Sequence, residues 1–192
     1  RDCAEYHVPV MVAHAFIGFE EHSPNEIGVR NFGRVVDEAE RLGVKLALEN
    51  TEGIEYLSRL FEAFSDRECV GFCWDTGHEM CYNWSEDVVG RFGQDGKLFA
   101  THLNDNLGIR DFEGKITWID DLHLLPFDGI ADWKGIAERL DRAGFDGTMT
   151  FELNTKSKPG RHENDKYDKM DIEQYVTEVY IRACRIAAMR KR

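Results

Sequence analysis

VGFCWDTGH, residues 70–78, joins a predicted buried strand to a polar loop. Its first part is an apolar run of strand length, rich in β-branched and aromatic residues. The run ends at Asp75, and His78 follows after Thr76 and Gly77. Two side chains able to bind a metal therefore stand at a strand end, where parallel α/β sheets carry their chemistry. Taken alone, the stretch is equally compatible with a strand and an ordinary turn.

Apolar runs of similar length recur along the chain and carry polar residues near their ends. They cover residues 7–14, 45–50, 98–105 and 148–153, with a shorter run at 123–127. Between them, helical apolar spacing covers residues 24–43, 54–64, 85–92, 131–144 and 171–189. In the first of these helices, Ser23 is the predicted N-cap, Pro24 the first helical residue and Glu26 the capping-box partner.

Strands that alternate with helices predict a parallel sheet built from βαβ units. We therefore predict an α/β fold, a (β/α)8 TIM barrel, in which residues 1–192 form a single domain. A complete barrel takes about 250 residues, so we expect this chain to hold the six C-terminal βα units and to lack the first two. The open parallel edges of such a sheet favour further residues outside the chain or association into a homo-oligomer.

The composition limits the class of partner. The net charge of −12 opposes binding to a phosphate backbone, so nucleic acid is not favoured. No apolar run reaches membrane-spanning length, and we expect no membrane association. The five cysteines form no CxxC pair, which is typical of reduced thiols in a cytoplasmic protein. Among them, Cys69 and Cys73 are interpreted as strand packing.

Four of the polar strand ends predict a metal site. Glu49, Asp75, His102 and Glu152 each lie at or near the carboxyl end of an apolar run, so a closed sheet would bring them to one mouth. Three converging carboxylates repel one another unless a cation compensates them, and no Lys or Arg occupies an equivalent position. A divalent metal ion is therefore the expected cofactor. Oxygen ligands with one imidazole suit Mn²⁺, Mg²⁺, Co²⁺ or Zn²⁺.

A family resemblance supports this arrangement. The strings LALEN, WDTGH, THLND, HLLPFDGIADW and FEL resemble the xylose isomerase-like superfamily of TIM barrels, which includes sugar isomerases, ketose epimerases, inosose dehydratases and apurinic-site endonucleases. The resemblance runs from about His7 to the C-terminus. It implies a small-molecule sugar substrate and one metal ion held by the residues that match Glu49, Asp75, His102 and Glu152.

In the isomerase and epimerase branch, the resemblance implies catalysis by two carboxylates. Glu49 and Glu152 would remove and return a proton as general base and acid, through an enediolate that the metal stabilises. His78 would bind a substrate oxygen, and His14 is a further substrate contact. An arginine follows the histidine ligand in these epimerases; Arg110 is the candidate here, although it lies farther along than that pattern expects.

Two alternatives remain open at this point. In the endonuclease branch, additional zinc ions are held in part by residues that match His14, His78, Asp121 and His123, so a second metal at His78, Asp121 and His123 is possible. In the isomerase branch, His123 is instead a substrate contact. The second alternative is a non-catalytic barrel that serves as a binding module, which would hold no metal at the strand ends.

Overall fold

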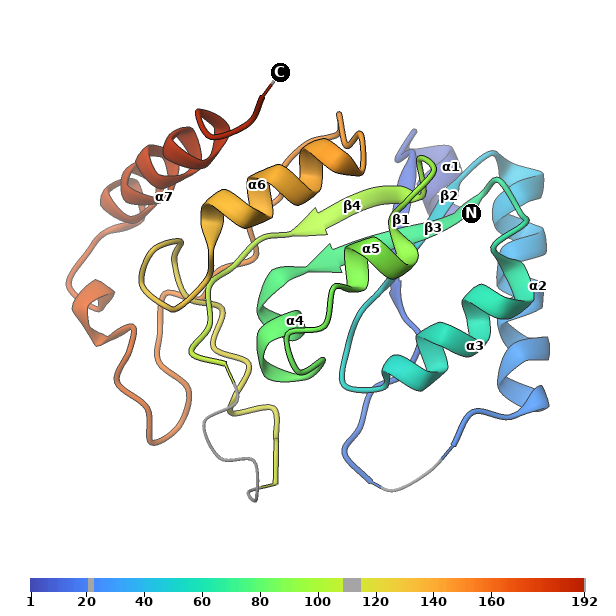
Figure 1. Ribbon diagram of the computed structural model, residues 1–192, viewed down its shortest axis with the longest axis horizontal. Helices are drawn as coiled ribbons and strands as arrows, with labels where there is room; N and C mark the ends of the chain where they lie inside the picture. The colour runs from blue at the N-terminus through green and yellow to red at the C-terminus, as the bar shows by residue number, and fades with distance from the viewer. Residues whose placement is uncertain (21–22, 109–114, 192) are drawn as a thin grey trace.

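The computed structural model describes residues 1–20, 23–108 and 115–191, and a parallel sheet forms its centre (Figure 1). Within these ranges the sheet has four strands: β1 (Val10–His14), β2 (Lys45–Glu49), β3 (Val70–Asp75) and β4 (Leu98–His102). They lie in the order β1-β2-β3-β4, and each strand is parallel to the next. The parallel α/β architecture predicted from the alternating pattern is therefore present.

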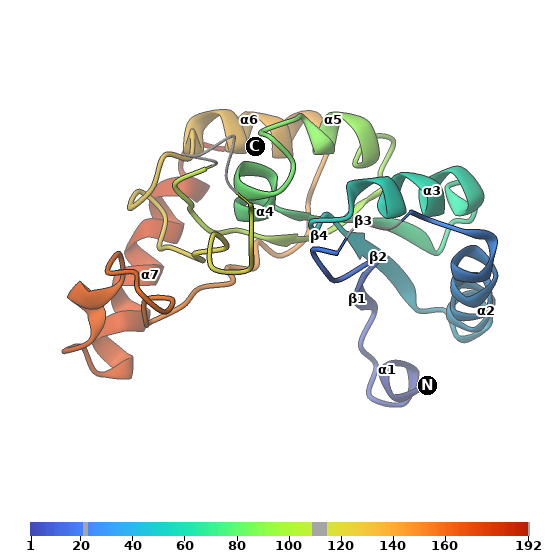
Figure 2. The ribbon, with the colours of Figure 1, turned by 90° about the horizontal axis from the view of Figure 1, so that it is seen from below.

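Helices surround this sheet mainly on one side. In chain order they are α1 (Asp2–Glu5), α2 (Glu26–Leu42), α3 (Ile54–Phe64), α4 (Thr76–Cys81), α5 (Val88–Phe92), α6 (Trp133–Arg142), the 3₁₀ turn η1 (Asp165–Tyr167) and α7 (Ile172–Ala187). Figure 2 shows α3, α5 and α6 on the same side of the sheet, with α2 at one end and α7 at the other. No helix among the described residues is long and apolar enough to cross a membrane.

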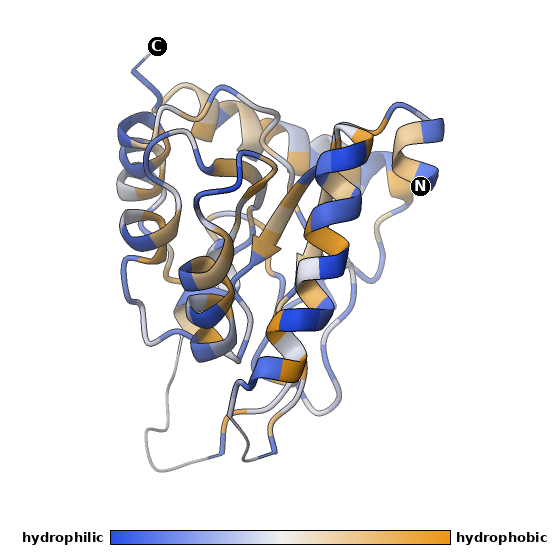
Figure 3. Ribbon diagram, turned by 90° about the vertical axis from the view of Figure 1, so that its right-hand side faces the viewer, coloured by the Kyte–Doolittle hydropathy of each residue, from blue (hydrophilic) through white to orange (hydrophobic). Residues whose placement is uncertain are grey.

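The core lies between the sheet and these helices. Alternate residues of β3, namely Val70, Phe72 and Trp74, are fully buried in it. Apolar side chains of the helices complete the cluster, and α2 alternates apolar and polar residues along its length, as Figure 3 shows. The other residues of β3, among them Cys73 and Asp75, therefore point to the opposite face of the sheet, which is the interior of a barrel.

Two predicted strands are corrected by the structure. Residues 123–127 and 148–153 make only isolated bridges, an antiparallel one between Asp105 and Leu124 and a parallel one between Leu103 and Phe151. Pro126 has no backbone N–H to donate, which disfavours a longer ladder in the first segment. The second segment stays next to the extension of β4, since Leu103 N donates to the Thr150 carbonyl at 2.8 Å.

Two local predictions were also wrong. The N-cap of α2 is Asn25 rather than Ser23, because Asn25 Oδ1 accepts hydrogen bonds from the amides of Ile27 and Gly28, both at 3.0 Å. The predicted loop after β3 is the short helix α4, which begins at Thr76 with Asp75 as its N-cap. His78 therefore lies on a helix, and its position is fixed more firmly than a loop would allow.

The register of the strands sets the position of the candidate site. His14 pairs with Glu49 across β1 and β2, and Asp75 pairs with His102 across β3 and β4. Because all four strands run in the same direction, these residues end at one edge of the sheet. Backbone pairing alone thus brings His14, Glu49, Asp75 and His102 to the carboxyl edge of the sheet.

Candidate metal centre

Four side chains meet at the carboxyl edge of the sheet, three from strand ends and Glu152 from the segment beside β4. Glu49, Asp75, His102 and Glu152 each offer one ligand atom, and these atoms lie within 4.8 Å of one another. Glu49 Oε2 and His102 Nδ1 are buried, and their nearest partners are other ionisable side chains, His14 Nε2 at 3.2 Å and Glu152 at 2.8 Å. Carboxylates this close together repel one another unless positive charge compensates them, so a cation fits here. The donor set, three carboxylates and an imidazole, suits a divalent metal ion.

Glu49 lies at the centre of this group and is almost entirely buried. Imidazole nitrogens approach its carboxylate from three described histidines: His102 at 3.1 Å, His14 at 3.2 Å and His78 at 3.3 Å. Burial by itself raises the pKa of Glu49, but the hydrogen bonds from these imidazoles outweigh it and hold the pKa well below its usual range. Glu49 is therefore a charged carboxylate that the histidines keep in place.

Asp75 is held by a carboxamide that the sequence analysis did not single out. Asn104 Nδ2 donates to both carboxylate oxygens of Asp75, at 3.2 and 3.0 Å, and the amide of His78 donates to Asp75 Oδ1 at 2.7 Å. A Cβ at Gly77 would lie 1.8 Å from Asn104 Oδ1, so only glycine permits this approach. Burial raises the pKa of Asp75 to about 6.

A second carboxamide ties the ends of β2 and β3 together. Asn50 Oδ1 accepts from the Asp75 amide at 2.8 Å, and Asn50 Nδ2 donates to the Asp75 carbonyl at 2.9 Å. The signal for both carboxamides was present in the sequence, because LEN and LND each carry an asparagine just after a strand end. What the sequence could not show is that both asparagines contact Asp75.

Glu152 completes the group from the segment beside β4. Its carboxylate lies 2.8 Å from His102 Nδ1, and its side chain is 47% exposed, whereas that of Glu49 is 1% exposed. The hydrogen bond with His102 lowers the pKa of Glu152. The pKa of His102 is raised, because hydrogen bonds with Cys73, Glu152 and Glu49 outweigh burial. The two glutamates thus approach His102 Nδ1 from a buried and from a solvent-exposed position.

A second cluster lies beside the first and consists of His78, Asp121 and His123, all buried. His78 Nδ1 lies 2.9 Å from the Asn50 carbonyl, and His123 Nδ1 lies 3.1 Å from the Glu152 carbonyl. A carbonyl can only accept, so each Nδ1 carries the proton of its ring. Both Nε2 atoms then face Asp121 Oδ2, at 3.5 and 2.7 Å. This is the orientation in which metal-binding histidines are normally held.

Asp121 carries the charge of this second cluster. Burial raises its pKa, but hydrogen bonds from His123 and His78 outweigh it and hold the pKa well below its usual range. The pKa of His123 is raised, because its interactions with Asp121 outweigh burial. Asp121 Oδ1 is buried and makes no hydrogen bond to any residue that the structure describes. Protonated imidazoles or a cation can therefore compensate Asp121.

The helix that carries His78 is braced from outside the site. Arg139 on α6 forms two hydrogen bonds of 2.6 Å with Glu79, the neighbour of His78 in α4. Trp74 Nε1 donates to the same carboxylate at 3.1 Å, and the Arg139 guanidinium lies 4.4 Å from the centre of the indole ring. Trp74 itself belongs to the hydrophobic core between the sheet and the helices. This contact fixes α4 against α6.

The remaining residues predicted for substrate binding have different outcomes. His14 lies at the group, with a side chain that is 41% exposed and that contacts Glu49. Arg110 lies outside the described residues. A cation that the sequence analysis did not consider stands nearby: Lys158 Nζ lies 4.0 Å from Asp121 Oδ2 and 5.3 Å from the centre of the Trp118 ring. Among the described residues, Lys158 thus brings positive charge next to Asp121.

Comparison with known proteins places this arrangement in a family. The family model described as xylose isomerase-like TIM barrel matches residues 2–171. The chain belongs to the xylose isomerase-like TIM barrel family. The TIM-barrel prediction is thereby confirmed, and the open parallel sheet described above is consistent with part of such a barrel.

The relatives of this TIM barrel are distant. An uncharacterized protein, y4fM of Sinorhizobium fredii, is 32% identical over 130 residues, which are 64% of this chain and 38% of that protein. The chain therefore spans well under half the length of that curated relative. The xylose isomerase domain protein of Planctomyces limnophilus matches with a TM-score of 0.67 at 18% identity, over 97% of this chain and 62% of that one.

A second structural match is a sugar epimerase. The D-psicose 3-epimerase of Clostridium cellulolyticum H10, solved with D-tagatose, matches with a TM-score of 0.61 at 18% identity. The match covers 97% of this chain and 66% of that one. At these identities the likeness to solved structures establishes the TIM-barrel fold.

Proposed function

We propose that this chain belongs to a divalent-metal-dependent isomerase or epimerase that acts on a sugar or sugar phosphate. The observation that carries the proposal is the pair Glu49 and Glu152, whose carboxylates approach His102 Nδ1 at 3.1 and 2.8 Å. Two carboxylates around one cation site are what proton transfer at a carbon next to a carbonyl requires. The sugar epimerase among the structural neighbours supports the same class of substrate.

The residues fit the metal ion that this chemistry needs. Glu49, Asp75, His102 and Glu152 would hold it, since their ligand atoms lie within 4.8 Å of one another and three neighbouring carboxylates require positive charge. A bound divalent ion polarises a substrate carbonyl and lowers the pKa of the adjacent C–H. Asn104 and Asn50 keep the Asp75 side chain and the strand end in position for this role.

The two glutamates have different environments and therefore different tasks. Glu49 is 1% exposed and charged, so it accepts a proton in a place that bulk water does not reach. Glu152 is 47% exposed, so solvent can reach its carboxylate. A substrate proton that Glu49 accepts should stay on its carboxylate longer than a proton that Glu152 accepts, because Glu49 is buried. Solvent hydrogen should accordingly enter the product mainly through Glu152.

Exchange of substrate hydrogen in D₂O tests this mechanism. The metal-loaded protein is incubated with a panel of ketoses and ketose phosphates, and deuterium incorporation is followed by NMR. Glu49→Gln and Glu152→Gln should each lower incorporation by at least about 100-fold, the usual contribution of a general acid or base. The matched control is Glu86→Gln, an exposed residue after α4, which should leave the rate unchanged. Exchange that survives both active-site changes would refute the two-carboxylate mechanism.

One observation favours a second candidate, a metal-dependent phosphodiester hydrolase. His78, Asp121 and His123 are oriented as a second ligand set, and hydrolases of phosphate esters commonly use more than one metal ion. The net charge of −12 opposes DNA as the substrate. Two or more zinc ions per chain together with cleavage of abasic DNA or of a small phosphodiester would establish the hydrolase. A chain that binds a ligand but holds no stoichiometric metal ion would instead favour a non-catalytic barrel.

A further inference from the structure

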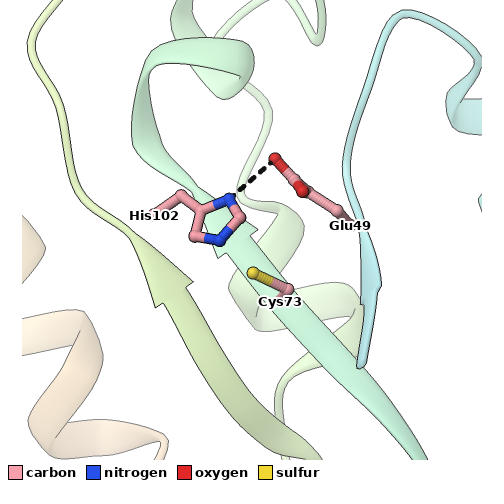
Figure 4. Close-up of side chains that lie close together, drawn as sticks. All are labelled: Glu49, Cys73 and His102. Carbon is pink, nitrogen blue, oxygen red and sulfur yellow. Dashed lines mark ion pairs between the residues drawn. The ribbon is translucent and has the colours of Figure 1, made fainter. Parts of the chain in front are cut away.

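A buried thiol lies directly inward of the metal centre. Cys73 is on β3, two residues before Asp75, so both side chains point to the interior face of the sheet. It is fully buried and pairs with Glu49 in the register of β2 and β3. Figure 4 shows the side chains of Glu49, Cys73 and His102 converging from three neighbouring strands. One ligand atom of each lies within 4.8 Å of the other two.

Packing alone does not account for this convergence. Glu49 is 1% exposed, and the contacts around it are to ionisable side chains: Glu49 lies 3.1 Å and Glu152 2.8 Å from His102 Nδ1. Packing of apolar groups alone would not place a thiol beside charged and polar atoms such as these. The set therefore combines a carboxylate and a thiol that are buried with an imidazole that is 20% exposed. Compared with the four-residue group, this set contains Cys73 instead of Asp75 and Glu152.

The chemistry of these three donors selects the cation. Mixed sulfur, nitrogen and oxygen ligation is typical of Zn²⁺ and also binds Co²⁺ and Cd²⁺, whereas Mg²⁺ and Mn²⁺ prefer oxygen ligands. We propose that Glu49, Cys73 and His102 form an inner binding position for a thiophilic divalent cation, with Cys73 as its thiolate ligand. The sulfur–metal bond replaces the S–H bond, and the thiol proton is released to solvent.

This inference deepens the proposed function, on which it rests through the shared ligands Glu49 and His102. The four-residue group by itself accepts any of the divalent ions considered from the sequence. Cys73 shifts the preference of the centre toward Zn²⁺ and Co²⁺. It also gives the ion two places with common ligands, one at the mouth of the sheet and one nearer its interior.

Titration with Co²⁺ tests the proposal, because a thiolate bound to Co²⁺ gives a strong near-ultraviolet charge-transfer band that carboxylate and imidazole ligands do not give. In the wild-type chain this band should grow as Co²⁺ is added and reach a plateau when the site is full. Cys73→Ser should lose it, and Cys73→Ala provides the same test if the serine variant does not fold. The matched control is Cys69→Ser, whose sulfur faces the Val36 carbonyl at 3.8 Å instead and whose loss should leave the band intact.

The outcomes separate this proposal from the proposed function. Co²⁺ binding with visible ligand-field bands but no charge-transfer band in the wild type would overturn the thiolate ligand and leave the four-residue centre standing. A band that persists in both Cys73 variants would also overturn it. Glu152→Gln should keep the band, since Glu152 is not part of the inner set. A chain that binds no Co²⁺ would refute both proposals.

Discussion

Asp105→Asn is the substitution for which the structure gives the most definite magnitude. Asp105 is fully buried, and each of its carboxylate oxygens accepts two hydrogen bonds. Oδ1 accepts from the amides of Asn106 and Ala131, and Oδ2 accepts from the amide of Phe127 and from Trp133 Nε1, each at 2.9 Å. These donors organise the segment that begins with Asp121 and His123, to which Asp105 is also joined by the backbone bridge with Leu124.

An amide in place of this carboxylate keeps one acceptor oxygen and turns the other into a donor. Whichever way the new side chain is oriented, two buried donors lose their partner and face an NH₂ group. Each unpaired buried donor costs about 1–3 kcal/mol, so the free energy of unfolding should fall by about 2–6 kcal/mol. Domains of this kind are stable by only about 5–15 kcal/mol in total. The variant should therefore be severely destabilised.

Urea unfolding followed by circular dichroism and tryptophan fluorescence measures this difference. The control is Asp132→Asn at the N-cap of α6, where Oδ1 accepts only from the Gly135 amide at 3.0 Å on the surface. Asparagine caps helices as well as aspartate does, so the control should lie within about 0.5 kcal/mol of the wild type. If Asp105→Asn were as stable as the control, the assignment of Asp105 as the anchor of this segment would be refuted.

Three further predictions concern single positions. Gly77→Ala should displace Asn104 from Asp75 and weaken binding of the divalent ion by about 10- to 100-fold in calorimetry, as loss of a supporting contact does. Gly28→Ala is the control, because a Cβ there would make only an ordinary contact with Asn25 Oδ1 at 3.9 Å. Equal affinities of the two variants would contradict the account. Asp128→Asn should lower the free energy of unfolding by about 2 kcal/mol at pH 7. Burial raises the pKa of Asp128, but Lys166, Tyr167 and Arg182 lower it overall. The difference should therefore be full above about pH 4, shrink below it and be lost as the pH falls through the lowered pKa of the folded state; a difference that is constant with pH would contradict this. Lys158→Met should raise KM for ketose phosphates about 10-fold or more and leave KM for free ketoses unchanged. The reason is that the Lys158 ammonium, which lies beside Asp121, can pair with a substrate phosphate. Equal effects on KM for both kinds of substrate would exclude this role.

The strand ends could be foreseen because they follow from period and direction alone. Apolar runs that alternate with helices give parallel strands, and parallel strands present Glu49, Asp75 and His102 at the same edge. No knowledge of side-chain contacts was needed for that step. The same reasoning anticipated the second cluster only through resemblance, because Asp121 and His123 lie in an irregular segment without a periodic pattern.

The details that sequence reasoning missed depend on contacts between distant residues. Helix α4 contains Thr76 and Gly77, which are poor helix formers, and it forms because Asp75 caps it and Arg139 holds Glu79 from α6. The N-cap of α2 went to Asn25 although Ser23 is an equally suitable residue type, and nothing in the local sequence distinguishes the two. In α4, tertiary contacts override the low helix propensity of the residues. At the start of α2, the propensities of Ser23 and Asn25 do not decide which residue is the N-cap.

Metal stoichiometry is the most direct test of the central claim that the strand ends form a divalent-cation centre. The chain is stripped with a chelator, dialysed against Zn²⁺, Co²⁺ or Mn²⁺, and its metal content is measured by mass spectrometry for the wild type and for His102→Ala. The expected result is at least one tightly held ion per wild-type chain, a thermal unfolding midpoint that rises with free metal, and loss of both in the variant. A wild-type chain that retains no ion, or a variant that retains as much as the wild type, would contradict the account.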